Sequence, residues 1–294
     1  MTNIGSKINF GKILGAAILM VALSVYGDDD LIKQGEYLTY AAGCITCHTE
    51  QSDDATRLAG GRAMETPFGT FYTPNITPDV QTGIGTWSGD DFVKALRQGV
   101  SPTGKHYFPS FPYSSYTGAG RQDLLAIKAY LFSLKPVNKE ILKHDLAWFI
   151  PARVAARGWK ALNFKPGRFQ PDPTRDERWN RGAYLVRHLG HCGECHTPRN
   201  SVGALRQEVE VAGNKFGGEK VPNITPHQAD GIGRWSESDI EYFLEIGMLP
   251  DGDFTGSSMA GVIDDNTSHL TRKDRLAIAV YLKSLPAFES TGKQ

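Results

Sequence analysis

Two copies of one five-residue motif constrain this chain more than any other feature of its sequence. The first copy is Cys44-Ile-Thr-Cys47-His48, and the second is Cys192-Gly-Glu-Cys195-His196. The chain contains four cysteines, and the two motifs use all of them. Any fold of this chain must therefore hold each cysteine pair and its histidine close together.

Three kinds of chemistry use paired cysteines at this spacing. A dithiol redox motif usually lies in a βαβ unit and does not need the histidine, and a zinc site shared by the two pairs would leave both histidines unused. Covalent haem attachment uses every residue, because the thiols bond to the haem vinyl groups and the histidine becomes the proximal iron ligand. The sequence therefore predicts two covalently bound haem c groups, attached through Cys44, Cys47, Cys192 and Cys195 and ligated by His48 and His196.

The first 27 residues have the composition of an export signal. Lys7 and Lys12 precede an apolar run of fourteen residues from Ile13 to Tyr26, which is shorter than the roughly twenty residues of a spanning helix. We predict that residues 1–27 are a signal peptide cut after Gly27 or an uncleaved N-terminal anchor. Both place the chain in the periplasm, either soluble or held at the inner membrane. Haem attachment fits this compartment, so structural disulfides are not expected despite its oxidising conditions.

The charge balance excludes one class of function. Residues 28–294 carry 30 basic and 32 acidic side chains when histidine is neutral. A nucleic-acid-binding protein would show a clear basic excess, so no nucleic-acid partner is expected. The 267 residues of this part contain no further apolar run of spanning length and suit two domains of ordinary size.

The two halves of the chain repeat one another. An offset of 148 residues superimposes Cys44 on Cys192, the two copies of PNITP, GIGTWS on GIGRWS, and Gly99 on Gly247. The offset is 147 for GEYL and GAYL near the start of each copy, and 151 for LAIKAYLFSL and LAIAVYLKSL near the end. A period of this length indicates two complete domains. We predict domains at residues 28–135 and 179–290, each with one haem.

Helices separated by long glycine- and proline-rich loops are expected in each copy. Ser88 with Asp91, and Ser236 with Asp239, have the spacing of capping boxes, and a glycine follows where each helix should end. Thr271, with Asp274 three residues later, is expected to cap the start of the last helix. The apolar residues of the last helix in each copy recur at helical spacing, which predicts core packing.

The segment between the copies, residues 136–178, has no counterpart in the repeat. It is rich in prolines and carries five aromatic residues, namely Trp148, Phe149, Trp159, Phe164 and Phe169. Because a flexible linker would be poor in aromatic residues, we expect this segment to pack across both domains. The alternative is a docking face for a partner protein.

A low-spin haem needs a second axial ligand, commonly a methionine from a loop before the last helix. In the second copy Met259 occupies that place, whereas Met248 is expected to pack at a helix end. At offset 148 Met259 falls on Phe111, which cannot bind iron. Met64, His106, water or no ligand at all remain open for the first haem, so we predict two haems with different axial ligation and different potentials.

Other polar residues have weaker claims to the haems. Trp87, Trp235, Tyr37 and Tyr184 could donate to a haem propionate, and Arg199 could pair with one. Packing at helix ends is the plain alternative. The remaining histidines show no ligand spacing and are expected on the surface or in the core; they are His144, His188, His191, His227 and His269.

The combination of Cys-x-x-Cys-His with TPNITP, GIGTW, FPSFPYSSY and AIKAYLFSL resembles the cytochrome c subunits of membrane-bound alcohol, gluconate and sorbitol dehydrogenases. The resemblance covers nearly the whole chain after residue 27. It implies a mainly α fold of two tandem class I cytochrome c domains with long Gly/Pro-rich loops. Those subunits usually carry three haem domains and this chain ends after two, so it is similar to a dihaem relative.

The resemblance implies an electron carrier, which passes electrons from a dehydrogenase subunit to a quinone or terminal oxidase. Many relatives have a methionine near the PSFPY element, and this chain does not. That difference leaves a second hypothesis, a dihaem enzyme of the peroxidase or thiosulfate dehydrogenase type with an open first iron. A scaffold that only holds a complex together is a third. The sequence leaves open whether the protein is itself a catalyst.

Overall fold

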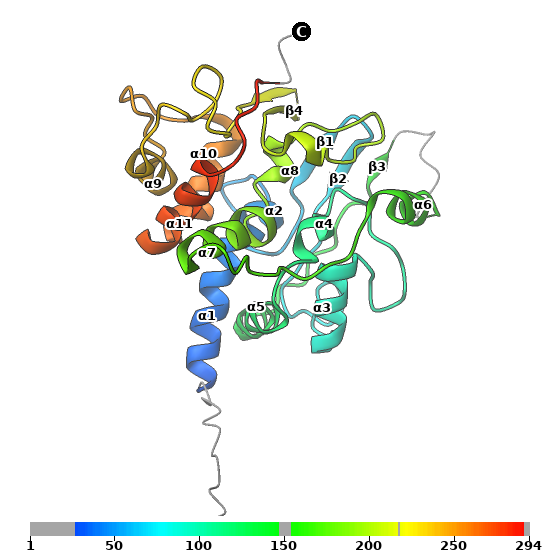
Figure 1. Ribbon diagram of the computed structural model, residues 1–294. Coiled ribbons are helices and arrows are strands. Elements are labelled where there is room, and N and C mark those ends of the chain that lie inside the picture. The colour runs from blue at the N-terminus through cyan, green and yellow to red at the C-terminus, as the bar shows by residue number, and fades with distance from the viewer. Residues whose placement is uncertain (1–26, 147–153, 217, 291–294) are drawn as a thin grey trace, which may run out of the picture.

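The computed structural model describes residues 27–146, 154–216 and 218–290. Most elements are helices and the strands are short (Figure 1), which confirms the prediction of a mainly α fold. Residues 1–26 of the expected leader, together with Trp148 and Phe149, lie outside the described residues. Within the described ranges, no helix combines the length and the apolar character that a membrane crossing requires.

The first half begins with α1 and ends with α5. In chain order its elements are α1 (Asp28–Ala41), α2 (Cys44–His48), β1 (Ala63–Thr66), β2 (Gly69–Tyr72), α3 (Gly89–Gln98), α4 (Tyr113–Tyr116) and α5 (Arg121–Ser133). The connecting segment contributes β3 (Asp145–Leu146) and α6 (Val154–Asn163). Strands β1, β2 and β3 form an antiparallel sheet in that order.

The second half repeats this order of helices. Its elements are α7 (Glu177–Tyr184), the π-helical turn η1 (Leu185–Leu189), α8 (Gly193–His196), the 3₁₀ turn η2 (Gln207–Val209), β4 (Asn214–Phe216), β5 (Glu219–Val221), α9 (Glu237–Ile246), α10 (Ser257–Asp265), the 3₁₀ turn η3 (Thr267–His269) and α11 (Arg272–Lys283). Strands β4 and β5 form an antiparallel hairpin.

In each half the first and last helices cross at a glycine. A Cβ atom on Gly35 of α1 would lie 1.9 Å from the carbonyl oxygen of Ala126 in α5. A Cβ atom on the equivalent Gly182 of α7 would lie 2.0 Å from the carbonyl oxygen of Ala277 in α11. Only glycine permits this close approach of two backbones. The GEYL and GAYL motifs are therefore helix-crossing motifs.

The predicted helix ends are confirmed. Ser88 and Ser236 form capping boxes with Asp91 and Asp239 at the starts of α3 and α9. Both helices end at glycines in the left-handed conformation, with φ of 59° at Gly99 and 77° at Gly247. The Thr271 side chain accepts from the backbone N–H of Asp274 and so caps α11.

The connecting segment packs against both halves. Trp159 of α6 packs against Tyr113 of the first half, and its indole N–H donates to the carbonyl oxygen of Val202 in the second half at 2.7 Å. Phe169 donates its backbone N–H to Gly118 of the first half and packs against Tyr184 of the second. Trp159 and Phe169 therefore contact both halves, as expected for aromatic residues of this segment.

Candidate haem-binding sites

Each Cys-x-x-Cys-His motif folds as a single helical turn near the middle of the molecule (Figure 1). Helix α2 comprises the whole first motif, and α8 begins one residue after Cys192. Residues three apart on a helix lie on the same face, so both thiols of a pair are presented on one side. Burial raises the pKa of Cys44 and of Cys192 to about 12. The thiols are therefore neutral in the folded chain.

The two motif histidines are oriented by the same backbone contact. His48 Nδ1 lies 2.8 Å from the carbonyl oxygen of Pro74, and His196 Nδ1 lies 2.8 Å from that of Pro222. A carbonyl can only accept, so Nδ1 carries the proton and Nε2 keeps its lone pair. Burial lowers the pKa of both histidines, and the proline carbonyls oppose that shift in part. This is the tautomer and charge state that a metal-ligating imidazole needs.

The PNITP motifs hold these carbonyls in place. Asn75 is 2% exposed, and its Oδ1 accepts from the backbone N–H of Thr77 at 2.9 Å. Its Nδ2 donates to the carbonyl oxygen of Val137 at 2.7 Å. In the second half Asn223 accepts from Thr225 at 2.8 Å and donates to Phe288 at 2.7 Å. The motif is thus a buried loop that fixes the proline beside the histidine and ties it to the chain beyond the last helix.

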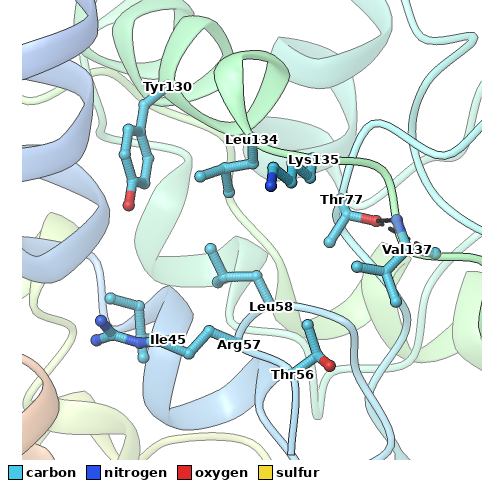
Figure 2. Close-up of a pocket in the computed structure, with 9 residues that line it drawn as sticks. All are labelled: Ile45, Thr56, Arg57, Leu58, Thr77, Tyr130, Leu134, Lys135 and Val137. Carbon is cyan, nitrogen blue, oxygen red and sulfur yellow. Dashed lines mark hydrogen bonds between the residues drawn. The ribbon is translucent and has the colours of Figure 1, made fainter.

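A pocket of about 230 Å³ lies beside the first motif (Figure 2). Ile45, the residue after the first cysteine, lines it together with Leu58 and Tyr130. The pocket also borders the PNITP loop, where the backbone N–H of Val137 donates to Thr77 Oγ1 at 3.2 Å. Most of its lining surface is apolar, and Arg57 and Lys135 also border it.

The loops that carry Phe111 and Met259 share their backbone hydrogen bonds at the start. Tyr107 donates its N–H to Gly99 at 2.9 Å, and Thr255 donates its N–H to Gly247 at 2.9 Å. Phe111 and Met259 follow four residues later, Phe111 in the turn before α4 and Met259 in the first turn of α10. Both are partly buried and pack against the same core as Cys44 and Cys192. The equivalence at offset 148 is therefore structural as far as Tyr107 and Thr255.

Phe111 is held among aromatic neighbours. Its ring centroid lies 5.6 Å from that of Tyr107 and 5.9 Å from that of Tyr116. Met64 lies on β1 opposite Phe71, in a different loop from Phe111. His106 follows the helix-ending turn of α3, and its Nδ1 is buried without a hydrogen-bond partner in the described part of the chain. Met64, His106 and Met259 as axial ligands stay predictions.

The two motifs are bonded reciprocally to the opposite half, which the sequence did not predict. Ser115 of the first half donates to Glu194 Oε1 of the second motif at 2.7 Å. Asn266 of the second half donates its Nδ2 to Thr46 Oγ1 of the first motif at 2.8 Å. Glu194 and Thr46 are equivalent positions, and so are Ser115 and Asn266 at offset 151. The halves therefore meet about an approximate two-fold axis that brings the two motifs together.

Three of the proposed propionate donors have protein partners instead. Tyr37 donates to Asp274 Oδ2 at 2.6 Å and Tyr184 donates to Asp123 Oδ2 at 2.5 Å, so both link the halves reciprocally. Arg199 donates to Glu194 Oε2 at 2.7 Å.

Two histidines that were expected on the surface or in the core also lie at the interface between the halves. His188 Nδ1 lies 2.9 Å from the carbonyl oxygen of Ser115, and His191 Nε2 lies 3.2 Å from that of Ala42.

The residues present fit covalently bound haem. Each half offers two reduced thiols on one helical turn and a neutral histidine whose free nitrogen is Nε2. Among the described residues, no group of three or more His, Cys, Asp or Glu side chains forms a metal cluster. A zinc site shared by the two motifs therefore finds no support in the geometry.

Comparison with known proteins agrees with this chemistry. No family model matches the chain. The chain is 43% identical over 289 residues to a diheme cytochrome c-type protein of Cereibacter sphaeroides, an alignment that covers 94% of this chain and 96% of the relative. It is 38% identical to the fructose dehydrogenase cytochrome subunit of Gluconobacter japonicus and 37% identical to the gluconate 2-dehydrogenase cytochrome c subunit of Pantoea cypripedii.

The dehydrogenase subunits are longer than this chain. The alignments cover 89% and 95% of this chain but only 54% and 65% of the two relatives. The relative from Cereibacter sphaeroides, in contrast, matches along almost its full length. The chain therefore belongs to the dihaem c-type cytochrome family that is related to the cytochrome c subunits of fructose, gluconate and alcohol dehydrogenases.

Proposed function

We propose that this protein is a periplasmic dihaem electron carrier. It receives electrons from a dehydrogenase and passes them through two covalently attached haem c groups to a respiratory acceptor, a quinone or a terminal oxidase. Residues 28–135 and 179–290 are proposed as the two class I cytochrome c domains, with residues 136–178 between them. The N-terminal residues 1–27 would export the chain or anchor it to the membrane.

One observation carries the proposal. In both halves a proline carbonyl lies 2.8 Å from Nδ1 of the motif histidine, next to two thiols on the same helical turn. The thiols of Cys44, Cys47, Cys192 and Cys195 would hold the porphyrins, and His48 and His196 would be the proximal ligands. When bound, haem iron supplies one-electron chemistry, and the protein sets its potential through ligands, hydrogen bonds and burial.

The first test is the mass of the exported protein after denaturation. Two thioether-bound haems would add two haem masses that survive unfolding. A Cys44→Ala/Cys47→Ala variant should retain one haem, and so should a Cys192→Ala/Cys195→Ala variant. An unmodified mass, or zinc in place of haem, would sink the proposal.

The second test concerns the sixth ligands. Met259→Leu should abolish methionine-type ligation at the second haem, seen in the visible spectrum and in a potential lowered by loss of the methionine ligand. Met248→Leu, in the same half, is the matched control and should leave the spectrum unchanged. If the two variants behave alike, Met259 is not the ligand.

A dihaem enzyme is the second candidate, and Phe111 is the observation that favours it. Phe111 stands at the sequence position of Met259, four residues after an equivalent backbone hydrogen bond, but has no group that could bind iron. A high-spin first haem that binds cyanide, together with turnover of peroxide or thiosulfate, would establish this alternative. Two low-spin haems that only exchange electrons would establish the carrier.

A further inference from the structure

The connecting segment covers one face of the first half. Lys160 of α6 is buried, and its Nζ donates to the carbonyl oxygens of Gln98 and Gly99 at 2.5 and 2.9 Å, where α3 ends. The same ammonium lies 4.5 Å from the ring centroid of Tyr113. A cation at a helix C-terminus is favoured by the helix dipole, and its position over an aromatic ring adds to the attraction.

Aromatic side chains complete this contact. The Trp159 and Phe164 rings pack edge-on against Tyr113, with centroids 6.5 and 5.2 Å away. The segment then continues along the first half, because Gly167 donates its backbone N–H to Thr117 Oγ1 at 3.1 Å. Lys160, with Trp159 and Phe164 on either side, is thus the part of the connecting segment that binds this face.

In the second half, no helix equivalent to α6 follows α11 among the described residues, and Gly261 stands at the position of Tyr113. Helix α9 ends at Ile246 and Gly247 as α3 ends at Gln98 and Gly99, and the turn that follows has the same hydrogen bonds. Three apolar side chains on α9 and this turn are exposed to solvent, namely Tyr242 (44%), Ile246 (40%) and Phe254 (60%). Their counterparts in the first half are the polar residues Lys94, Gln98 and His106. An apolar face of this kind is typical of a protein interaction site.

The charge around this face indicates what it binds. Residues 237–265 contain eight acidic residues and no lysine or arginine, whereas the equivalent residues 89–117 contain two acidic residues and three lysines or arginines. Arginines from outside this range pair with Glu237, Glu241 and Glu245, so these three acids are compensated. Asp251 and Asp253 are exposed on the turn beside Phe254 and form the acidic rim of the face. Opposite charges on two surfaces steer their encounter and select the partner.

We propose that the face formed by Tyr242, Ile246 and Phe254, with its acidic rim, docks a basic segment of a partner protein. A lysine or arginine of that segment would donate to the carbonyls at the end of α9, and flanking aromatic side chains would cover the three apolar residues. The contact of Lys160 with the carbonyl oxygens at the end of α3 is the internal example for the lysine or arginine in this mode.

The chain itself supplies a probe. A fluorescent peptide of residues 154–169 (VAARGWKALNFKPGRF) has the lysine, the aromatic residues and the basic charge that the face requires. We expect saturable binding to the full-length holoprotein, measured by fluorescence anisotropy, that weakens as salt is raised. A peptide with Lys160→Met should bind about tenfold more weakly, which corresponds to about 1.4 kcal/mol.

Variants of the holoprotein locate the binding site. Phe254→Ser should weaken peptide binding at least tenfold, and Asp251→Asn/Asp253→Asn should weaken it and flatten its salt dependence. Val80→Ser is the matched control, because Val80 is an exposed apolar residue of the first half. Unchanged circular dichroism would show that the variants are folded.

Three outcomes would overturn the proposal. The first is the absence of saturable binding, and the second is equal binding to Phe254→Ser and to the unaltered protein, which would place the peptide elsewhere. The third is a concentration-dependent dimer in sedimentation velocity that Phe254→Ser abolishes, since the occupant would then be a second copy of this chain.

Discussion

At the scale of single residues, the asparagines of the two PNITP motifs show how much of each site the sequence motifs predict. Asn75 and Asn223 each make the same hydrogen bonds to a threonine two residues later and to a carbonyl beyond the last helix. Both side chains are buried, so the loss of either hydrogen-bond partner would leave a buried polar group that water cannot satisfy. The PNITP repeat could be found in the sequence, but its partners Val137 and Phe288 could not, because they lie more than sixty residues away without a motif of their own.

Replacement of Asn75 by alanine should destabilise the protein. The change leaves the Thr77 N–H and the Val137 carbonyl without this partner, and we expect a loss of about 1–3 kcal/mol in the free energy of unfolding. Urea unfolding of the holoprotein followed by circular dichroism measures it. Asn138→Ala is the control, because Asn138 is exposed, and it should change the free energy by less than about 0.5 kcal/mol. Equal effects would show that Asn75 does not organise the loop.

Phe111, which stands at the sequence position of Met259, can also be tested by substitution. Phe111→Met places a thioether at the position equivalent to Met259, and we expect methionine-type ligation at the first haem with a higher potential. A redox titration followed by visible absorption measures both. Phe108→Met is the control on the same loop, because Phe108 packs against Phe71 and His144 and should not alter the haem. An unchanged spectrum in Phe111→Met would place Phe111 away from the iron.

At the scale of elements, local sequence predicted helix ends well and tertiary contacts poorly. The capping boxes at Ser88 and Ser236 depend only on residues three positions apart, so they could be recognised in the sequence. The role of Gly35 and Gly182 depends on a backbone about ninety residues later in the chain. The sequence revealed that these glycines repeat, but not that each one is the contact point of two helices.

The helix crossing should not tolerate even one methyl group. In Gly35→Ala the new Cβ would lie 1.9 Å from the Ala126 carbonyl oxygen, so α1 and α5 must separate. We expect a loss of about 3 kcal/mol, measured as the midpoint and slope of urea unfolding. Gly158→Ala in α6 is the opposite case, since a Cβ there meets no atom within 4 Å, and it should stabilise the helix by about 0.5–1 kcal/mol. If both variants lose stability equally, the crossing is looser than described.

At the scale of the whole molecule, the halves are joined by hydrogen bonds that occur in equivalent pairs. Tyr37 with Asp274 and Tyr184 with Asp123 form one pair, and the contacts of Thr46 and Glu194 form another. The internal repeat indicated two domains, but no pattern within one copy could show which residues bond to the other copy. For that reason the sequence alone leaves Tyr37 and Tyr184 with two possible roles, donation to a haem propionate or packing at a helix end.

The Asp274 contact should make the interface sensitive to acid. Burial alone would raise the pKa of Asp274, but hydrogen bonds from Arg181 and Tyr37 outweigh it and hold the pKa below its ordinary value. Its stabilising contribution is therefore complete above about pH 4, the unfolded value, and is lost as pH falls through the lower folded pKa.

Asp274→Asn tests this contribution. We expect a loss of about 1–3 kcal/mol at pH 7 and a smaller decline in stability below pH 4 than in the unaltered protein, from urea unfolding at a series of pH values. Asp90→Asn is the control, because its ion pair with Arg121 is exposed and should contribute little. Parallel pH curves for Asp274→Asn and the unaltered protein would contradict the assignment.

The reciprocal arrangement of the halves has a consequence for how such a protein can change. Where two identical chains assemble about a two-fold axis, one substitution alters both copies of every contact at once. Here the two copies occupy one polypeptide, so each can mutate independently, and threonine at 46 already corresponds to glutamate at 194. A single polypeptide thus permits one Cys-x-x-Cys-His motif to acquire a carboxylate while the other motif remains uncharged at that position.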